Sequence, residues 1–275
     1  MNITIEALPI LDLEHPGSHD PEYRKRREWI AEIAIRFHTE QQQDIPIVRY
    51  TPEEDKTWNH VFHKLAPLHE QWACSWYHEG RKKLFIDGKK IPQLHDLNER
   101  LSVFGFRLEP IHGLVSPREF LMKLGEGIML STQYIRHHSK PEFTPEPDII
   151  HEVLGHVPMF THAPLRELSI LIGRAARDAT EEDLTKLNRL YWYSIEYGLI
   201  REKGEVKAFG AGLLGGIHDF TSAFSGNVII KPFVMKDVLE TDYNYSFEQP
   251  HFFVIPSFEY LAEETKKLIA GFGRN

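Results

Sequence analysis

Two histidines five positions apart, His151 and His156, are the first residues in this sequence whose type and spacing indicate chemistry. They lie in a short predicted helix that Pro145 and Pro147 help to start and Pro158 limits, because proline is tolerated in the first turn of a helix but not in its interior. Imidazole nitrogens are common metal ligands. On an ideal α-helix, residues five apart are separated by about 140° around the axis. We therefore expect the two rings to lean toward a shared metal from different sides of the helix.

The five-residue interval also bears on the class of metal site. In the zinc-protease pattern H-E-x-x-H the histidines are four residues apart, and both point the same way. A zinc hydrolase with Glu152 as general base is an alternative, but the longer interval argues against it. Gly155 comes directly before the second histidine. We expect it to let the helix distort or to let a neighbouring backbone come close.

A third candidate ligand is Glu196, the only charged residue in a run of aromatic and aliphatic side chains. A carboxylate that is buried without a partner is costly or becomes neutral, so we expect a cation beside it. A metal held by the two histidines would supply that cation. Two histidines and one carboxylate are the ligands of non-haem Fe(II) oxygenases. From these three residues alone, a satisfied core pair of histidines, with the glutamate paired to Arg189 or Arg201, explains the pattern equally well.

Longer motifs make the pattern specific. They are Thr-Gln-Tyr-Ile-Arg at 132–136, Thr-Pro-Glu-Pro-Asp at 144–148, His-Glu-Val-Leu-Gly-His at 151–156, the segment 191–198, and Phe-Gly-Ala-Gly-Leu-Leu at 209–214. In this order they resemble the pterin-dependent aromatic amino acid hydroxylases, with phenylalanine hydroxylase the most similar. The resemblance runs from about 106 to 214 and continues more weakly toward the C-terminus. It implies a mainly α-helical catalytic domain with a few short strands.

The resemblance also implies the cofactors. The family uses Fe(II), O2 and a tetrahydropterin such as tetrahydrobiopterin, and the pterin supplies two of the electrons that the reaction of O2 requires. By this resemblance His151, His156 and Glu196 are the catalytic iron ligands.

Five residues are expected to form the pterin site by resemblance. The segment 113–120 matches the family's pterin loop, in which Phe120 would stack on the pterin ring and the backbone around Gly113 and Val115 would bond its edge. Glu152 and Tyr191 would line the same site. Without the resemblance, Phe120 would be interpreted as an ordinary core aromatic residue on a capped helix.

Another set of residues is expected to bind the amino acid substrate. Arginine is suited to a carboxylate because its planar fork makes two parallel hydrogen bonds. By resemblance Arg136 has this role, and Thr144 and Asp148 hold it and its loop in place. Pro147 and Trp192 would wall the aromatic ring. Tryptophan hydroxylases have phenylalanine where this chain has Trp192, so the interpretation leans away from an indole substrate.

The chain departs from the family pattern at five positions. Pro117 replaces a common serine and Asn188 a small residue, which affects the expected pterin side-chain preference. Leu130 lies where animal phenylalanine hydroxylases have histidine. Gly215, at a substrate-binding position, replaces a serine that supports an iron-ligating histidine. Tyr245 lies near the position that distinguishes phenylalanine from tyrosine hydroxylases and matches neither. The ring position attacked is therefore less determined than the type of reaction.

Composition limits the possible partners and compartment. The 275 residues carry a net charge of −8, from 32 basic and 40 acidic side chains, so a nucleic-acid partner is not expected. Cys74 is the only cysteine, which excludes an intramolecular disulfide and suits a reducing cytoplasm. We expect no secretory signal and no membrane span. The expected partners are small molecules: an aromatic amino acid, O2 and a tetrahydropterin.

Hydrophobic periodicity and capping residues predict a helix-rich fold. Predicted helices cover about 21–41, 51–65, 69–79, 91–104, 116–124, 165–179, a segment from 180 that carries Glu196, and 256–268. Extended segments are expected at 106–110, 128–135, 229–230 and 252–254, with a short strand or loop at 83–89. The glycine-rich segment 209–216 is expected to turn rather than continue a helix.

These observations predict one catalytic domain over residues 1–275, with 1–20 irregular. We expect neither a regulatory domain nor a tetramerisation tail, and hence a monomer. The predicted activity is hydroxylation of L-phenylalanine to L-tyrosine. Alternatives within the same fold are hydroxylation of phenylalanine at the meta position, or of tyrosine or tryptophan. More distant alternatives are the zinc hydrolase and a binding protein that does not turn over a ligand.

Overall fold

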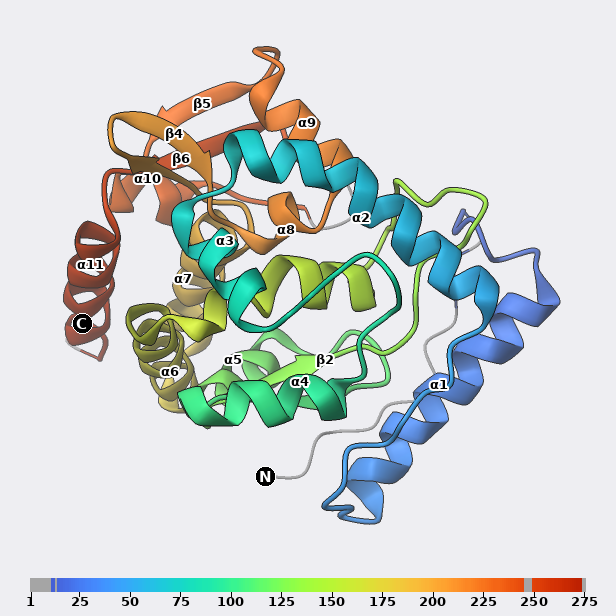
Figure 1. Ribbon diagram of the computed structural model, residues 1–275. Coiled ribbons are helices and arrows are strands. Elements are labelled where there is room, and N and C mark those ends of the chain that lie inside the picture. Colours follow the sequence, from blue (N-terminus) through green and yellow to red (C-terminus); the bar gives the residue numbers. More distant parts are fainter. Residues whose placement is uncertain (1–10, 13, 245–248, 274–275) are drawn as a thin grey trace.

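Helices dominate the structure, as the sequence predicts. The computed structural model describes residues 11–12, 14–244 and 249–273, and Figure 1 shows its helices around a central helical segment, coloured lime green. The α-helices are α1 (Pro21–Thr39), α2 (Pro52–Trp72), α3 (Ser75–Lys83), α4 (Leu94–Leu101), α5 (Pro117–Gly125), α6 (Ala163–Asp178), α7 (Glu181–Tyr191), α8 (Ala211–Leu214), α9 (Ile217–Phe224), α10 (Met235–Glu240) and α11 (Phe258–Ala270). Short 3₁₀ segments are η1 (Ser102–Phe104) and η3 (Met159–Thr161), and π-helical segments are η2 (His151–His156) and η4 (Trp192–Glu196).

In the part of the chain that the structure describes, six short strands form two sheets. The strands are β1 (Arg107–Pro110), β2 (Ile128–Ser131), β3 (Leu199–Glu202), β4 (Glu205–Ala208), β5 (Ile229–Pro232) and β6 (His251–Ile255). Strands β1 and β2 pair in parallel, and the larger sheet has the order β4-β3-β6-β5. Strands β3 and β4 form an antiparallel hairpin, in which Lys203 and Gly204 both have positive φ, as a tight two-residue turn requires.

Polar side chains at helix starts fix the positions of several helices. Thr51 and Glu54 form the predicted capping box of α2, in which each side chain bonds the other residue's backbone N–H. Ser116 and Thr180 cap α5 and α7 by accepting from the N–H groups of Glu119 and Asp183. Each cap satisfies an N–H group that lacks a partner inside its helix. The predicted starts of these three helices are therefore confirmed.

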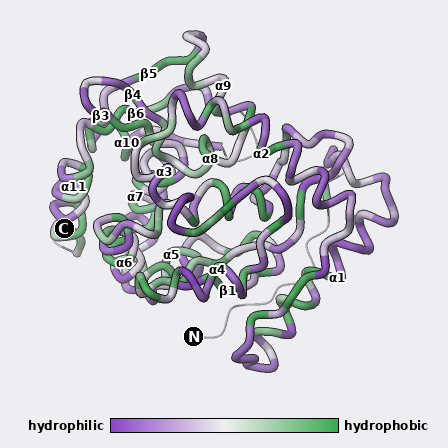
Figure 2. The backbone as a smooth tube through the Cα atoms, in the orientation of Figure 1, coloured by the Kyte–Doolittle hydropathy of each residue, from purple (hydrophilic) through white to green (hydrophobic). Residues whose placement is uncertain are grey.

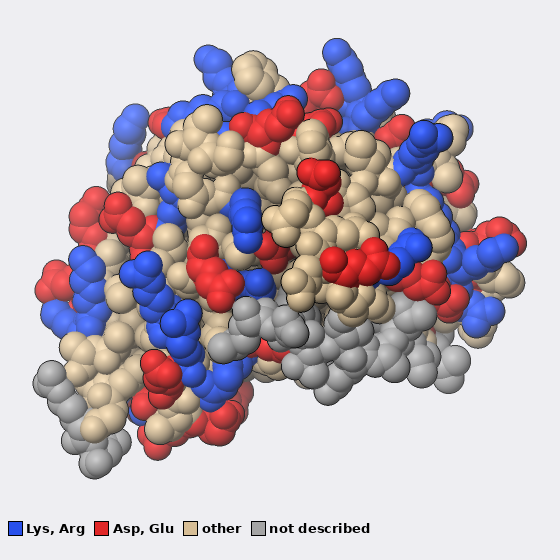
Figure 3. Space-filling view, turned by 90° about the horizontal axis from the view of Figure 1, so that it is seen from below, with Lys and Arg blue, Asp and Glu red and all other residues tan. Residues whose placement is uncertain are grey.

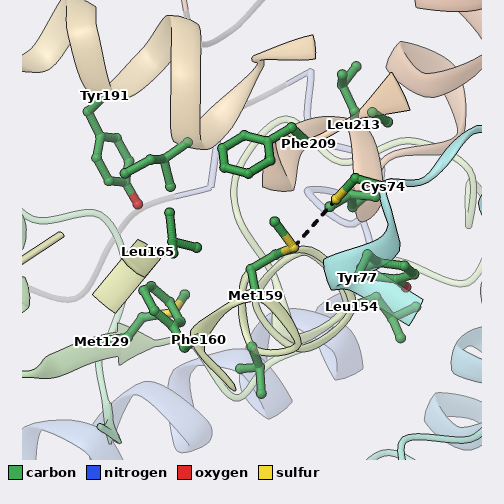
Figure 4. Close-up of a cluster of buried hydrophobic side chains, with 14 of the residues drawn as sticks. Cys74, Tyr77, Met129, Leu154, Met159, Phe160, Leu165, Tyr191, Phe209 and Leu213 are labelled. Carbon is green, nitrogen blue, oxygen red and sulfur yellow. Dashed lines mark hydrogen bonds between the residues drawn. The ribbon is translucent and has the colours of Figure 1, made fainter. Parts of the chain in front are cut away.

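The main core surrounds η2. The largest cluster of buried hydrophobic side chains extends from Trp58 in α2 to Leu261 in α11. Figure 4 shows the part where the sulfur atoms of Cys74 and Met159 approach to 4.0 Å. Hydrophobic and hydrophilic residues alternate along helices such as α1 (Figure 2), as expected for amphipathic helices on a core.

The prediction that the second helix ends near Leu65 is wrong. Helix α2 continues to Trp72, with Pro67 inside it, and the next helix runs over Ser75–Lys83 instead of 69–79. Pro67 is exposed, so the carbonyl left without an intrahelical partner can bond water. The buried stripe continues past the proline to His69, and its packing keeps the helix intact.

Other segments differ from the prediction in smaller ways. The glycine-rich segment 209–216 was expected only to turn, but it includes the one-turn helix α8. Helix α4 begins at Leu94 rather than near 91, and 83–89 forms no strand. The hairpin β3–β4 and the helices α9 and α10 were not predicted, because elements of four to eight residues carry little periodic signal.

Charge is mixed on the surface. Acidic and basic side chains are intermingled over the face in Figure 3. Within the described ranges, no helix combines the length and apolar character that crossing a lipid bilayer requires.

Candidate active site

The two predicted metal-ligating histidines open and close a π-helical turn. In η2 the N–H of Val157 donates to the carbonyl of Glu152 at 3.1 Å, a span of five residues. Residues five apart therefore lie one turn apart on the same face, and the rings of His151 and His156 have centroids 5.0 Å apart. The expectation that the rings approach from different sides of an α-helix is wrong, because the helix itself is wound differently.

Gly155 makes this turn possible by allowing a close contact. A Cβ atom at Gly155 would lie 2.5 Å from the carbonyl oxygen of Ala211 in α8. No other residue fits without a shift of backbone, so the expectation of close backbone approach is confirmed. The contact fixes η2 against α8, which is followed directly by Gly215.

A second π-helical turn brings the carboxylate to the histidines. In η4 the N–H of Tyr197 donates to the carbonyl of Trp192 at 2.8 Å, which turns Glu196 inward. Its Oε1 lies 2.9 Å from Nε2 of His156, and its Oε2 lies 3.5 Å from Nε2 of His151. Both ring nitrogens therefore face one buried carboxylate.

The protonation states in this cluster suit metal binding. Burial lowers the pKa of His151 to about 4, so its ring is neutral near pH 7 and has a lone pair to donate. Burial alone would raise the pKa of Glu196, but His156 and His151 outweigh it and hold that pKa below its usual range. A neutral imidazole beside an ionised carboxylate is the form in which these residues bind a divalent cation.

The alternative salt bridges of Glu196 do not form. Arg189 instead binds Asp242 and the carbonyl of Leu239, and Arg201 binds the carbonyl of Gly204. Among the described residues, the histidines are therefore the only basic side chains that pair with Glu196.

Glu152 competes with Glu196 as a possible ligand. One of its carboxylate oxygens lies within 4.8 Å of ring nitrogens of both histidines. Burial and the nearby charge of Glu196 raise the pKa of Glu152 well above its usual range. Glu196, whose two oxygens face the two ring nitrogens, remains the candidate metal ligand, and Glu152 lies beside it.

Arg136 is held in a fixed orientation beside the metal-binding cluster. Its Nε and Nη2 bond the two oxygens of Asp148 at 2.9 and 2.7 Å, and Nη2 also lies 3.4 Å from the carbonyl oxygen of Gly215. Burial raises the pKa of Asp148, but Arg136 outweighs it and lowers the net value. Thr144 does not contact the arginine; its hydroxyl donates to the carbonyl of Glu146 at 2.6 Å and stabilises the loop instead.

One cavity joins all the nominated residues. Its volume is about 480 Å³, enough for an amino acid with a cofactor beside it. The predicted residues that line it are Gly113, Val115, Phe120, Arg136, Thr144, Pro147, His151, Glu152, His156, Tyr191, Trp192, Glu196 and Gly215. Segments more than 100 residues apart in the sequence therefore contribute to the same site.

Comparison with known proteins identifies the family. The model of the biopterin-dependent aromatic amino acid hydroxylases matches residues 1–275. The chain belongs to this family. It is 40% identical over 272 residues to a tyrosine 3-monooxygenase of Schistosoma mansoni and 39% identical over 265 residues to the phenylalanine-4-hydroxylase of Bos taurus. These matches cover 97% and 94% of the chain, but the chain spans only 58% of the length of each relative.

Solved structures of hydroxylases share the fold. The apo phenylalanine hydroxylase of Colwellia psychrerythraea has a TM-score of 0.75 at 29% identity, covering 82% of this chain and 89% of its own. The enzyme of Chromobacterium violaceum with bound iron(III) and 7,8-dihydrobiopterin also has a TM-score of 0.75, at 27% identity, covering 80% and 82%. The predicted family and fold are confirmed, as is the biopterin class of cofactor that the family description names.

The cavity wall near Phe120 is aromatic and apolar. The Phe120 ring meets the edge of Tyr191, with centroids 5.6 Å apart, and packs on a small cluster of Ile111, Val115 and Leu130. Leu130 is 2% exposed, so where some hydroxylases have histidine this chain has a buried apolar contact. The wall suits the face of a flat ring.

Gly215 is required by packing. A Cβ atom there would lie 2.8 Å from Cα of His151, so a serine would have to move one of the two segments. Its carbonyl, rather than a side chain, faces Arg136. The backbone of Gly215 therefore packs directly against the backbone of His151 in η2.

The cavity also includes residues that sequence reasoning missed. Tyr243 stacks on Trp192 with centroids 4.3 Å apart, and His218 and Asp219 line the cavity from the first turn of α9. The signal for α9 was a short amphipathic pattern after two glycines, which looked like a turn. Tyr245, expected near the specificity position, lies outside the described residues.

Proposed function

We propose that this protein hydroxylates the ring of L-phenylalanine to give L-tyrosine, with Fe(II), O2 and a tetrahydropterin. The observation that carries the proposal is the convergence of His151, His156 and Glu196 in one cavity with the paired arginine Arg136. A metal site with open positions beside a carboxylate-binding arginine suits an amino acid substrate.

Each residue has a distinct part in the proposed reaction. His151, His156 and Glu196 bind the iron, and iron and tetrahydropterin together supply the activation of O2. Arg136 binds the substrate carboxylate, and Asp148 holds the guanidinium in the required plane. The burial of these groups excludes water from the reacting ring.

The walls of the cavity support phenylalanine as the substrate. The indole N–H of Trp192 donates to Gln249 at 3.0 Å, so the tryptophan offers only its apolar face to a ligand. Pro147 lines the same cavity and has no side-chain hydrogen-bonding group. An unsubstituted aromatic ring fits such walls better than a phenol, whose hydroxyl would need a partner.

The pterin is proposed to lie against Phe120 and Tyr191. Gly113 and Val115 would bond its edge through backbone groups, since both line this part of the cavity. Glu152 lines the same cavity and would bond the pterin through its carboxyl group. The family match, to hydroxylases, speaks against the zinc hydrolase alternative.

A product assay tests the proposed function. The protein is incubated with Fe(II), tetrahydrobiopterin and O2, with phenylalanine, tyrosine and tryptophan each offered separately, and products are identified by chromatography with mass detection. We expect para-tyrosine from phenylalanine, dependent on both iron and pterin. Meta-tyrosine, or product from another amino acid only, would contradict the assigned substrate. No product with iron bound would overturn the proposed activity.

A further inference from the structure

His69 is a buried histidine that does not line the cavity and that the proposed mechanism does not use. It lies in the last turn of α2. Its Nε2 lies 2.7 Å from the carbonyl oxygen of Leu214, the last residue of α8. Its Nδ1 lies 3.2 Å from the hydroxyl oxygen of Tyr77 in α3. One imidazole ring therefore joins three helices.

The two contacts determine which ring nitrogen carries the proton. A carbonyl oxygen only accepts hydrogen bonds, so Nε2 of His69 donates to Leu214, and Nδ1 is left to accept from the hydroxyl of Tyr77. The ring is also held by packing, because its centroid lies 4.4 Å from that of Tyr77 and 5.7 Å from that of Phe220 in α9. His69 is thus a hydrogen-bond donor with a fixed position and a fixed tautomer.

The segment that His69 contacts has few anchors of its own. Helix α8 is four residues long, and glycine occupies positions 210, 212, 215 and 216 in and around it. A helix of one turn is not stable by itself, and glycine has no side chain to pack. The last carbonyls of a helix lack partners inside it, and that of Leu214 finds one in His69. The position of α8 therefore depends on contacts from other elements.

The residue that follows Leu214 touches the active site. The carbonyl of Gly215 accepts from Nη2 of Arg136 at 3.4 Å, and a Cβ atom at Gly215 would lie 2.8 Å from Cα of His151. Asp148 holds the same guanidinium through its two carboxylate oxygens. A shift of the peptide between Leu214 and Gly215 would therefore remove one of the groups that orient Arg136.

We propose that His69 is a positioning residue for the amino acid substrate. Its bond to the Leu214 carbonyl fixes the backbone of α8, so that the carbonyl of Gly215 stays against Arg136 and the guanidinium stays aligned for a carboxylate. The proposed pterin wall belongs to α5 and α7, which this bond does not reach. The effect is therefore on binding of the amino acid rather than of the pterin. This inference rests on the proposed function.

Removing the donor while keeping a ring tests the inference. His69→Phe keeps an aromatic side chain but cannot donate, whereas His69→Gln keeps an N–H group for the Leu214 carbonyl. Isothermal titration calorimetry on the iron-loaded protein measures the affinity for L-phenylalanine, and steady-state kinetics measures the KM values for phenylalanine and tetrahydrobiopterin. In His69→Phe we expect the phenylalanine affinity to fall about tenfold and the pterin KM to change by less than about twofold. His69→Gln should restore the affinity to near the wild-type value.

Hydrogen exchange reports on the backbone itself. Amides of 211–220 should exchange faster in His69→Phe than in the wild type, because the segment has lost its tether to α2. The exchange should return toward the wild-type rate in His69→Gln. Amides of α5 and α7 should exchange at the same rate in all three proteins.

His162→Phe provides a matched control. Nε2 of His162 also lies close to a backbone carbonyl oxygen, that of Trp76 at 2.9 Å, but His162 does not line the cavity or contact α8 through this bond. We expect this variant to bind phenylalanine as the wild type does. Circular dichroism and iron content establish that each variant is folded and loaded. His69→Leu, which also lacks a donor, keeps the test open if His69→Phe does not fold.

Three results would overturn the inference. An unchanged phenylalanine affinity in folded His69→Phe would mean that the bond positions nothing. An equal loss in His69→Gln would mean that the shape of the ring matters and its donor does not. An equal rise in the KM values of phenylalanine and pterin would indicate a general loss of packing. If the wild type formed no hydroxylated product, the proposed function itself would fail, and that failure appears before any substitution is made.

Discussion

Two clusters of histidine and carboxylate side chains occur in this molecule, and they differ in how deeply they are buried. His151, Glu152 and His156 form one cluster, and Asp20, His137 and His138 form another, with donor atoms within 4.8 Å of one another in each. Glu196 lies against both histidines of the first cluster, which is called the cavity cluster below. The first cluster lies in the core cavity, whereas His138 in the second is exposed. Only in the first do two ring nitrogens face one carboxylate. Proximity of histidine and carboxylate is common to both, so it does not distinguish a metal site.

The two clusters differ in the hydrogen-bond partners of their polar groups. Asp20 caps α1, where its Oδ1 accepts from the N–H groups of Glu22 and Tyr23. Its Oδ2 lies 3.2 Å from Nε2 of His137, whose Nδ1 lies 2.7 Å from the hydroxyl oxygen of Ser139. These groups already have partners and need no cation. In the cavity cluster the carboxylate depends on the histidines themselves, and a shared metal would replace that contact.

Removing a histidine from the cavity cluster is the most severe test of this comparison. We expect His151→Ala to lose iron affinity and activity by about 100-fold or more, because a site with three protein ligands cannot spare one. The fold should persist, because the variant no longer has the cost of burying the His151 imidazole away from water. Iron content by mass spectrometry and circular dichroism measure the two effects. Stoichiometric iron in the folded variant would show that His151 is not a ligand.

The arginine that separates the two clusters is the next test. Arg136 directly precedes His137, and it makes its fork contact with Asp148 on the cavity side. Arg136→Lys keeps the charge but loses the planar fork. We expect the phenylalanine KM to rise about 30-fold, equivalent to about 2 kcal/mol, with the pterin KM unchanged. Steady-state kinetics measures both constants, and an equal rise in the two would argue against carboxylate binding by Arg136.

The backbone contact beneath the cavity cluster should be sensitive to a single methyl group. Gly155→Ala places a Cβ 2.5 Å from the Ala211 carbonyl, so either η2 or α8 must move. We expect a loss of about 1–3 kcal/mol in stability together with weaker iron binding. Gly271→Ala is the control, because its nearest contact is 3.2 Å and its φ is ordinary for any residue. Urea unfolding compares the two, and equal stability would contradict the tight contact.

The contact of Gly155 with Ala211 also shows where sequence reasoning reaches its limit. Residue type and spacing nominated His151 and His156, whose rings the structure brings together. The π-helical turn that does so depends on the long-range approach of α8, which no local pattern records. The motif resemblance supplied the rest of the nominated cavity residues.

Capping residues and hydrophobic periodicity predicted the positions of the longer helices well. The starts of α2, α5 and α7 were predicted from capping residues, whose effect is local. Short elements such as β3 and β4 were missed because their pairing, not their own composition, stabilises them. The continuation of α2 through Pro67 was missed for the opposite reason, since packing of a buried stripe outweighs a local helix breaker.

The buried histidine His69 tests whether burial keeps imidazoles neutral here. His69 bonds the carbonyl of Leu214 at 2.7 Å, and burial lowers its pKa to about 3. In the unfolded chain the pKa is near 6.5, so as pH falls below 6.5 the unfolded state gains a proton that the folded state does not. Stability is therefore fully present above pH 6.5 and declines toward pH 3, by about 1.4 kcal/mol per pH unit.

The His69→Gln variant isolates this contribution, because glutamine can still donate to the Leu214 carbonyl but does not titrate. We expect its free energy of unfolding to fall less steeply than that of the wild type between pH 6.5 and 4.5. Urea titrations at several pH values measure the difference between the two slopes. Parallel pH dependences would mean that His69 accepts a proton in the folded state.

The smallest effect is expected in the cluster of Asp20, His137 and His138. His138 is exposed, and its nearest acidic partner is Glu53 at 3.5 Å. We expect His138→Ala to change stability by less than about 0.5 kcal/mol, because exposed pairs are worth little. Metal content should stay at one iron per chain, as in the wild type. The wild type could instead hold a second metal that His138→Ala loses and His151→Ala keeps. That result would make the cluster of Asp20, His137 and His138 a metal site. It would also show that satisfied hydrogen bonds do not exclude one.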